Sequence, residues 1–158
     1  MHQSLISLRN FTLGTALAAV AALATAEEVE YLSGSGVLPD NLPFSEAVRV
    51  GNTYYLSGQL GVKPGKMELV EGGIREEARQ TMENIGAVLA AHGLGMNDIV
   101  KCTVMLADMS EWGIFNEVYR TFFTQNYPAR SAFGSNGLGL GARAEVDCIA
   151  VASQGNGE

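Results

Sequence analysis

Hydrophobic positions recur with two different periods along the chain, and together these periods predict an α/β fold. From residue 74 to 92, apolar or small residues recur at spacings of three and four, which predicts one long helix with a buried face. These positions are Ile74, Ala78, Met82, Ile85 and Leu89. Residues 45–50 and 53–62 are short runs rich in Val, Tyr and Leu on either side of Gly51-Asn52, which predicts a hairpin.

The second half of the chain repeats this alternation of strand and helix. Residues 98–108 are rich in β-branched residues and predict a strand, and residues 112–123 predict a second helix capped by Ser110 and ended before Pro128. Residues 129–133 and 144–152 predict two further strands. This order predicts one α/β domain with a single mixed sheet and two helices on one face. The other face then needs a cover, so we expect an oligomer.

The N-terminal segment has the pattern of a secretory signal peptide. Arg9 precedes an apolar run from Phe11 to Leu23, and Ala24-Thr25-Ala26 provides a small-residue cleavage site. The run of about 13 residues is short for a membrane span, which needs about 20. We therefore expect residues 1–26 to be removed, the protein to be periplasmic or secreted, and no membrane contact afterwards.

Composition divides the remaining chain into three parts. Residues 27–43 contain Ser-Gly-Ser-Gly and two prolines, which predicts a linker. Residues 44–152 form the expected folded domain, and residues 153–158 form a flexible tail.

Charge and residue counts narrow the function. The whole chain has a net charge of −7, and loss of Arg9 leaves nine Lys and Arg against seventeen Asp and Glu. This charge repels phosphate backbones, so we expect no nucleic-acid partner. After cleavage His92 is the only histidine, expected as a solvated residue in the last helical turn, and no His-rich metal site is possible.

Two cysteines, Cys102 and Cys148, do not match a zinc-binding spacing. Free cysteines usually behave as small buried core residues, and this interpretation is favoured. A disulfide bond remains open as the alternative, because export would place the pair in an oxidising compartment.

The candidate catalytic and binding residues lie near the C-terminus of the chain. Glu145 and Asp147 are two positions apart in a strand and therefore share a face. A carboxylate among apolar residues can have a raised pKa and act as a general acid or base. Arg130 has a planar fork that binds a carboxylate with two parallel hydrogen bonds. Two strands joined by a loop can bring Arg130 and Glu145 to one pocket.

These residues also resemble a known family. The stretches Y-P-A-R-S from Tyr127 and A-E-V-D-C-I-A-V from Ala144 are similar to the signature of the Rid family of reactive-intermediate deaminases (RidA/YjgF). The resemblance runs from about residue 42 to 151. It implies a chorismate-mutase-like fold and a homotrimer whose uncovered sheet faces form a central barrel, with pockets between subunits. The implied reaction is the hydrolysis of enamine or imine forms of amino acids to 2-oxo acids and ammonia, with no metal or organic cofactor.

The resemblance also implies a role for each matching residue. Arg130 would bind the carboxylate of the substrate, and Glu145 would position or activate the attacking water. Residues 57–59 and Asn116 would line the pocket. The matched substrate-binding positions are Phe44, Ser57, Gly58, Asn116 and Ala132.

Two of the departures from the family pattern leave alternatives open. Phe44 stands where RidA-type members have tyrosine, and Ala132 stands where they commonly have cysteine. The missing phenolic hydroxyl favours a non-catalytic trimer that binds small carboxylates as the first alternative. An endoribonuclease is the second, and the negative charge disfavours it. The expected partner is a small carboxylate-bearing imine or another small acid.

Overall fold

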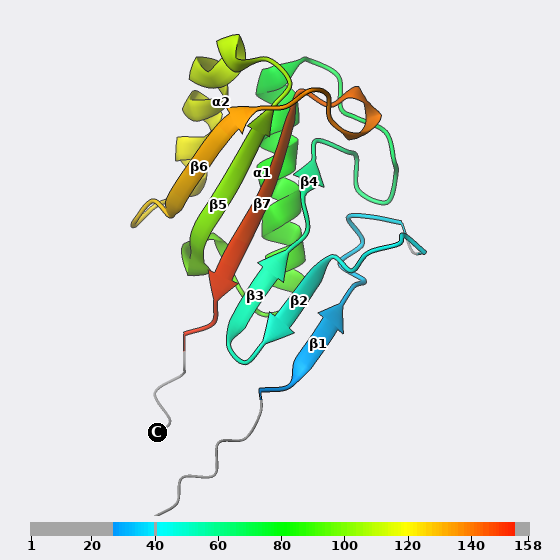
Figure 1. Ribbon diagram of the computed structural model, residues 1–158, viewed down its shortest axis with the longest axis vertical. Helices are drawn as coiled ribbons and strands as arrows, with labels where there is room; N and C mark the ends of the chain where they lie inside the picture. Colours follow the sequence, from blue (N-terminus) through cyan, green and yellow to red (C-terminus); the bar gives the residue numbers. More distant parts are fainter. Residues whose placement is uncertain (1–26, 40, 154–158) are drawn as a thin grey trace, which may run out of the picture.

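Within residues 27–39 and 41–153, which the computed structural model describes, one sheet is backed by two helices (Figure 1). The strands of this part of the chain are β1 (Val29–Leu32), β2 (Ala47–Val50), β3 (Thr53–Leu56), β4 (Gln59–Leu60), β5 (Ile99–Leu106), β6 (Ala129–Gly134) and β7 (Ala144–Val151). The helices are α1 (Ile74–Ala91) and α2 (Trp112–Tyr119), and 3₁₀ turns cover Met96–Asp98, Met109–Glu111, Arg120–Phe122 and Gly139–Gly141. The predicted α/β class, with both helices on one face, is confirmed.

The sheet is mixed, as predicted. Its strand order is β1-β2-β3-β7-β5-β6, with β4 paired to β7 beyond the end of β3. The β5–β6 pair is parallel and the other pairs are antiparallel. A parallel neighbour requires a crossover connection, and α2 lies within the crossover from β5 to β6.

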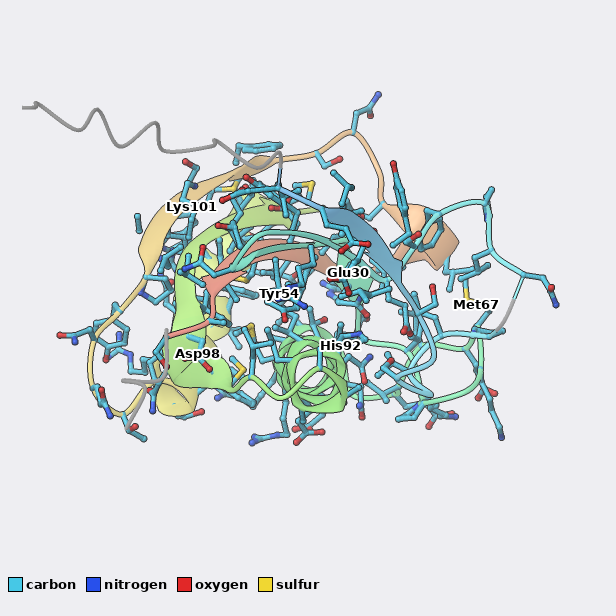
Figure 2. All side chains as sticks on the ribbon, turned by 90° about the horizontal axis from the view of Figure 1, so that it is seen from below. Glu30, Tyr54, Met67, His92, Asp98 and Lys101 are labelled. Carbon is cyan, nitrogen blue, oxygen red and sulfur yellow. A yellow bond between two sulfur atoms is a disulfide. The ribbon has the colours of Figure 1, made fainter. Side chains whose placement is uncertain are left out.

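Alternation along the strands gives the sheet two distinct faces. The core face packs against the helices and includes Tyr54 and Ala150, which are register partners on β3 and β7. The open face carries their neighbours Tyr55 and Ile149. Figure 2 shows Tyr54 between the sheet and α1, and Lys101 on the opposite side of the sheet.

Helix α1 contributes most of the helical packing against the core face. All five positions predicted for its buried face are buried, and Met82 and Ile85 have no exposed surface. Burial of one such side chain is worth about 1.5 to 3 kcal/mol. This helix therefore holds the core face in place under the strands that carry the candidate site.

The predicted linker over residues 27–43 contains a strand, β1. Strand β1 pairs with β2 along its full length, from Val29 opposite Val50 to Leu32 opposite Ala47. Farther along, the buried carboxylate of Glu46 accepts hydrogen bonds from the backbone N–H and the hydroxyl of Ser35, at 2.9 and 2.6 Å. Because this anchor is eleven residues away, the local Gly and Ser content does not reveal it.

The two cysteines are buried, as predicted, but they are not free. Cys102 on β5 and Cys148 on β7 are register partners and form a disulfide bond, with their Cα atoms 4.1 Å apart. The favoured prediction of two thiols is therefore wrong, and the alternative holds. The pairing depends on the register between β5 and β7, which the spacing of cysteines in the sequence does not determine.

The predicted cap of the second helix is also wrong. Asp108 Oδ1 accepts a hydrogen bond from the backbone N–H of Ser110 at 2.8 Å, so aspartate caps the preceding 3₁₀ turn. Helix α2 then begins at Trp112 and ends at Tyr119, and a 3₁₀ turn continues to Phe122.

His92 is half-buried at the end of α1 rather than solvated. It is the C-cap residue of the helix, and its Nε2 is shielded from solvent without a hydrogen-bond partner among the described residues.

Part of the prediction about the chain ends lies outside the described residues. This applies to the signal peptide over residues 1–26 and to residues 154–158 of the tail. Among the helices that the structure describes, none is both long and apolar enough to cross a bilayer.

Candidate functional site

Arg130 lies on the core face of β6, the edge strand beside α2. Its parallel register partner is the buried Cys102, which shares that face. The guanidinium carbon lies over two aromatic rings, 4.6 Å from the ring centre of Tyr119 and 5.1 Å from that of Trp112. A cation within about 6 Å of a ring centre is attracted by the negative face of the ring.

Helix α2 presents both rings to β6 because they are seven residues apart. Seven residues make almost two helical turns, so Trp112 and Tyr119 lie on the same side of α2, with Asn116 between them. Tyr119 also packs against Phe115 and Phe123, with ring centres 5.8 and 4.9 Å apart. The aromatic cluster therefore fixes the ring that lies under Arg130.

A cavity of about 500 Å³ opens beside this arginine. It is lined by Asn116, Tyr119, Arg120, Tyr127, Pro128 and Arg130. In the described part of the chain, no carboxylate forms an ion pair with Arg130. Burial raises the pKa of Tyr119, and the nearby Arg130 charge partly opposes this. The cavity therefore has an available cation in an aromatic wall, which suits an anion with an apolar side.

Sequence reasoning identified Arg130 and Asn116 in this cavity but missed Tyr119 and Tyr127. It also missed Trp112, whose ring lies against the Arg130 guanidinium. The spacing of Trp112, Asn116 and Tyr119 along one helix face is a visible signal. This spacing identifies the residues near Arg130 only when that face of the helix is known to pack against Arg130.

Glu145 lies on the open face of β7, opposite Met105 on β5. Its carboxylate occupies the space that a side chain at position 58 would fill, because a Cβ on Gly58 would overlap Glu145 Oε1. Burial raises the pKa of the Glu145 carboxyl, and the charge of Asp147 adds to the effect. A carboxyl with a raised pKa can transfer protons closer to neutral pH, as expected of Glu145 from the sequence.

The segment around Ser57 is fixed by hydrogen bonds to its neighbours. The Ser57 backbone N–H donates to the carbonyl of Glu46 at 2.9 Å, and its hydroxyl donates to the carbonyl of Ser45 at 2.6 Å. Buried Gln59 donates from Nε2 to the Ser57 carbonyl at 3.3 Å. Phe44 is half exposed beside a small cavity of about 70 Å³.

The structure divides the predicted site residues into two groups. The Arg130 half consists of Arg130, Asn116 and Ala132, with Trp112 and Tyr119. The Glu145 half consists of Glu145, Gly58 and the adjoining Ser57. Phe44 lines a separate small cavity and directly precedes Ser45, whose carbonyl accepts the Ser57 hydroxyl. Ala132 lies two positions beyond Arg130 and therefore on the same face of β6.

Arg130 and Glu145 are on opposite faces of the sheet. Arg130 shares the core face with Cys102 and Cys148, whereas Glu145 shares the open face with Met105. The prediction that one loop brings both residues to one pocket is therefore wrong within a single chain. The alternation of side chains along β7 places Glu145 on the face that the helices do not cover.

Metal chemistry has no evident ligand set in the part of the chain that the structure describes. No group of three or more His, Cys, Asp and Glu side chains there is arranged to hold an ion.

Comparisons with known proteins identify the family of this chain. The family model described as Endoribonuclease L-PSP matches residues 38–152. A Mus musculus protein named 2-iminobutanoate/2-iminopropanoate deaminase is 47% identical over 109 residues, which cover 69% of this chain and 81% of the mouse protein.

Solved structures agree as well. RidA from the Antarctic bacterium Psychrobacter sp. PAMC 21119 has a TM-score of 0.73 at 38% identity, covering 78% of this chain and 99% of that one. E. coli TdcF with bound serine has a TM-score of 0.73 at 31% identity, with the same coverage. The chain therefore belongs to the Endoribonuclease L-PSP family, which is the Rid (RidA/YjgF) family that its sequence resembles.

Proposed function

We propose that this protein hydrolyses 2-imino acids to 2-oxo acids and ammonia without a cofactor. The observation that carries the proposal is the Arg130 guanidinium, which lies in an aromatic-walled cavity of about 500 Å³ and forms no ion pair among the described residues. A relative at 47% identity is named an imine deaminase, which supports this class of reaction.

Arg130 binds the substrate carboxylate. The fork of its guanidinium matches a planar carboxylate with two parallel hydrogen bonds. This contact fixes the orientation of C2, the carbon that carries the imine nitrogen. A relative whose structure holds serine, which also carries a carboxylate, supports this ligand class.

Glu145 handles the protons. A water oxygen attacks C2 of the protonated imine, and Glu145 accepts a proton from that water as the C–O bond forms. The protonated carboxyl then returns the proton to the nitrogen. The C–N bond breaks as the C2 hydroxyl loses its proton to the departing ammonia, so the 2-oxo acid and ammonium leave. The raised pKa of Glu145 suits both steps, because the group must accept and release one proton in each cycle.

Two copies of the chain complete each site in this proposal. Arg130 and Glu145 are on opposite faces of one sheet, so a ligand between them requires one residue from each of two subunits. The open face also carries a row of large side chains that needs a cover. Register partners place Tyr31, Val48, Tyr55 and Ile149 side by side across β1, β2, β3 and β7. A homotrimer with these faces turned inward covers the row.

A mixing experiment tests the shared site. Arg130→Ala and Glu145→Gln chains are each purified, unfolded together and refolded as mixed trimers. If each site takes its arginine and its glutamate from different chains, random assembly restores about one quarter of the sites. Imine hydrolysis well above that of either parent supports the proposal. No gain over the parents, with trimers of normal mass, contradicts it.

A trimer that binds small carboxylates without turnover is the second candidate. Phe44 favours it, because a half-exposed phenyl ring stands where a phenolic hydroxyl is usual in the resembled family. Restoring the hydroxyl with Phe44→Tyr should raise the imine hydrolysis rate without changing the mass of the oligomer. If the unmodified protein binds pyruvate tightly, and neither it nor the Phe44→Tyr variant hydrolyses an imine, the result favours the trimer that binds carboxylates without turnover. The net charge of −7 gives no support to a nuclease.

Export from the cytoplasm belongs to the same proposal. The Cys102–Cys148 disulfide supports it, because such bonds form and persist in oxidising compartments. Fractionation of cells that express the full chain, followed by mass measurement of the exported protein, tests it. A mature chain that begins at Glu27 is the expected product, and full-length protein in the cytoplasm contradicts the proposal.

A further inference from the structure

We infer that Trp112 and Tyr119 are positioning residues that hold the Arg130 guanidinium ready for the substrate carboxylate. This inference rests on the proposed function, since it assigns a task to the rings around the proposed carboxylate clamp. We call Arg130 together with the rings of Trp112 and Tyr119 the aromatic bracket.

The geometry of the bracket leaves the N–H groups of the arginine available to a ligand. Both ring centres lie within 5.1 Å of the guanidinium carbon. The rings attract the cation through their faces, but they offer no carboxylate oxygen that competes with a ligand. A salt bridge would hold the side chain equally well, yet it would occupy the N–H groups that bind the substrate.

The rings themselves are held firmly. Tyr119 is 5% exposed and packs between Phe115 and Phe123. Trp112 is the first residue of α2 and directly follows the turn that Asp108 caps. An arginine held by fixed rings loses less freedom when it binds a ligand than a freely rotating one does, and such preorganisation strengthens binding.

The two rings differ in how they can be tested. Trp112 is half-buried, so its replacement disturbs the core less than that of Tyr119. Trp112→Leu removes one ring of the bracket, and Trp112→Phe is the matched control that keeps a ring. Tyr119→Phe keeps the second ring and removes only a hydroxyl that has no hydrogen-bond partner among the described residues.

Binding of pyruvate by the full protein, measured by titration calorimetry, is the first test. Trp112→Leu should bind pyruvate about 3- to 30-fold more weakly than the unmodified protein, the range expected for loss of a cation–π contact. Trp112→Phe, which keeps a ring, should recover most of the affinity that Trp112→Leu loses, and Tyr119→Phe should lose less affinity than Trp112→Leu. In imine hydrolysis, Trp112→Leu should raise KM and leave kcat unchanged, because the bracket acts on ground and transition states alike.

Fluorescence provides a test without any substitution in the bracket. The chain has a single tryptophan, so its emission reports only on Trp112. Pyruvate should change this emission with the same saturation curve as the calorimetric titration, whereas pyruvamide, which lacks the carboxylate, should not.

The outcomes separate the two claims. If Arg130→Ala binds pyruvate as well as the unmodified protein, the carboxylate clamp is wrong and the bracket has no role. If Arg130→Ala loses binding but Trp112→Leu keeps full affinity, the clamp stands and only the bracket is wrong. Pyruvate binding with no change in tryptophan emission also overturns the bracket.

Discussion

The Arg130 half and the Glu145 half are built by different means. The Arg130 half depends on side-chain packing, in which rings on α2 hold a cation beside a cavity. The Glu145 half depends on backbone, since Gly58 leaves room for the carboxylate and hydrogen bonds to backbone carbonyls fix Ser57. The first arrangement suits binding of a fixed anion, and the second suits a carboxylate that must gain and lose a proton.

This difference predicts that substitutions in the two halves have separable effects. Damage to the Arg130 half should weaken ligand binding. Damage to the Glu145 half should slow the chemical step and leave binding of the 2-oxo acid intact. The following predictions test this separation, beginning with the largest expected effect.

Replacement of Arg130 should be the most damaging change. Truncation of one partner in a desolvated charge pair costs about 2 to 5 kcal/mol, so Arg130→Ala should lose this much in kcat/KM and in pyruvate affinity. Arg130→Lys should be nearly as poor, because lysine keeps the charge but lacks the planar fork. Steady-state kinetics and calorimetry on both variants measure the loss. Full activity with unchanged pyruvate affinity in Arg130→Lys would rule out a carboxylate clamp.

Removal of the disulfide should lower the stability of the protein more than a substitution in either half of the site does. The bridge joins residues 46 apart in sequence, and a loop of that size is worth about 2 to 4 kcal/mol of unfolding free energy. Urea unfolding of the Cys102→Ala, Cys148→Ala double variant measures the loss. Because the rings of α2 lie against the Arg130 guanidinium independently of the bridge, kcat/KM of the folded variant should stay close to normal. A variant as stable as the unmodified protein would show that the bridge adds nothing to the fold.

The fold could be predicted from the sequence wherever periodicity is strong and local. Helix α1 and strands β5 and β7 are found where their patterns indicate, because burial of one face imposes that spacing. Strand β1 was missed because its partner β2 and the Glu46 anchor come later in the chain. The disulfide was missed for a related reason, since only the β5–β7 register places the cysteines opposite each other.

The candidate site could be predicted as a set of residues but not as an arrangement. The motif around Arg130 and the carboxylates of β7 identified the charged groups. The face on which each lies depends on how β6 and β7 pair with β5, and this separates Arg130 from Glu145. The bracket of Trp112 and Tyr119 depends on the packing of α2 on β6, which no local pattern encodes.

A side chain at position 58 should disable the Glu145 half alone. In Gly58→Ala the new Cβ overlaps Glu145 Oε1, and the end of the flexible glutamate side chain must move away. Loss of a positioned acid or base costs about 100-fold in rate, so kcat should fall by about that factor while pyruvate affinity stays unchanged. Gly95→Ala is a matched control, because its Cβ would meet no atom within 4 Å and its φ is −136°. Equal kcat values for the two variants would contradict the proposed position of Glu145.

The smallest expected effect is a pH-dependent gain in stability from Glu145→Gln. Burial and the Asp147 charge raise the pKa of Glu145 in the folded protein above its ordinary value of 4.5. The folded state therefore binds this proton more readily than the unfolded state does. Stability is lost as the pH rises from the ordinary pKa of 4.5 through the raised pKa of the folded protein. Glu145→Gln avoids the cost of the buried charge, so it should be more stable than the unmodified protein near pH 7. The gain should vanish well below pH 4.5, where the carboxyl is protonated in both states.

Urea unfolding of the two proteins across this pH range measures the difference, and Asp147→Asn should reproduce part of the gain by removing the neighbouring charge. The activity of the unmodified enzyme should change over the same pH range. It should fall as the pH drops and Glu145 becomes protonated. An identical stability difference at both ends of the range would mean that folding does not raise the pKa of Glu145. Glu145 would then be no better suited to carry a proton than an ordinary surface carboxylate. The pH dependence of pyruvate binding sharpens the contrast, because the affinity of the Arg130 half should not follow the Glu145 titration.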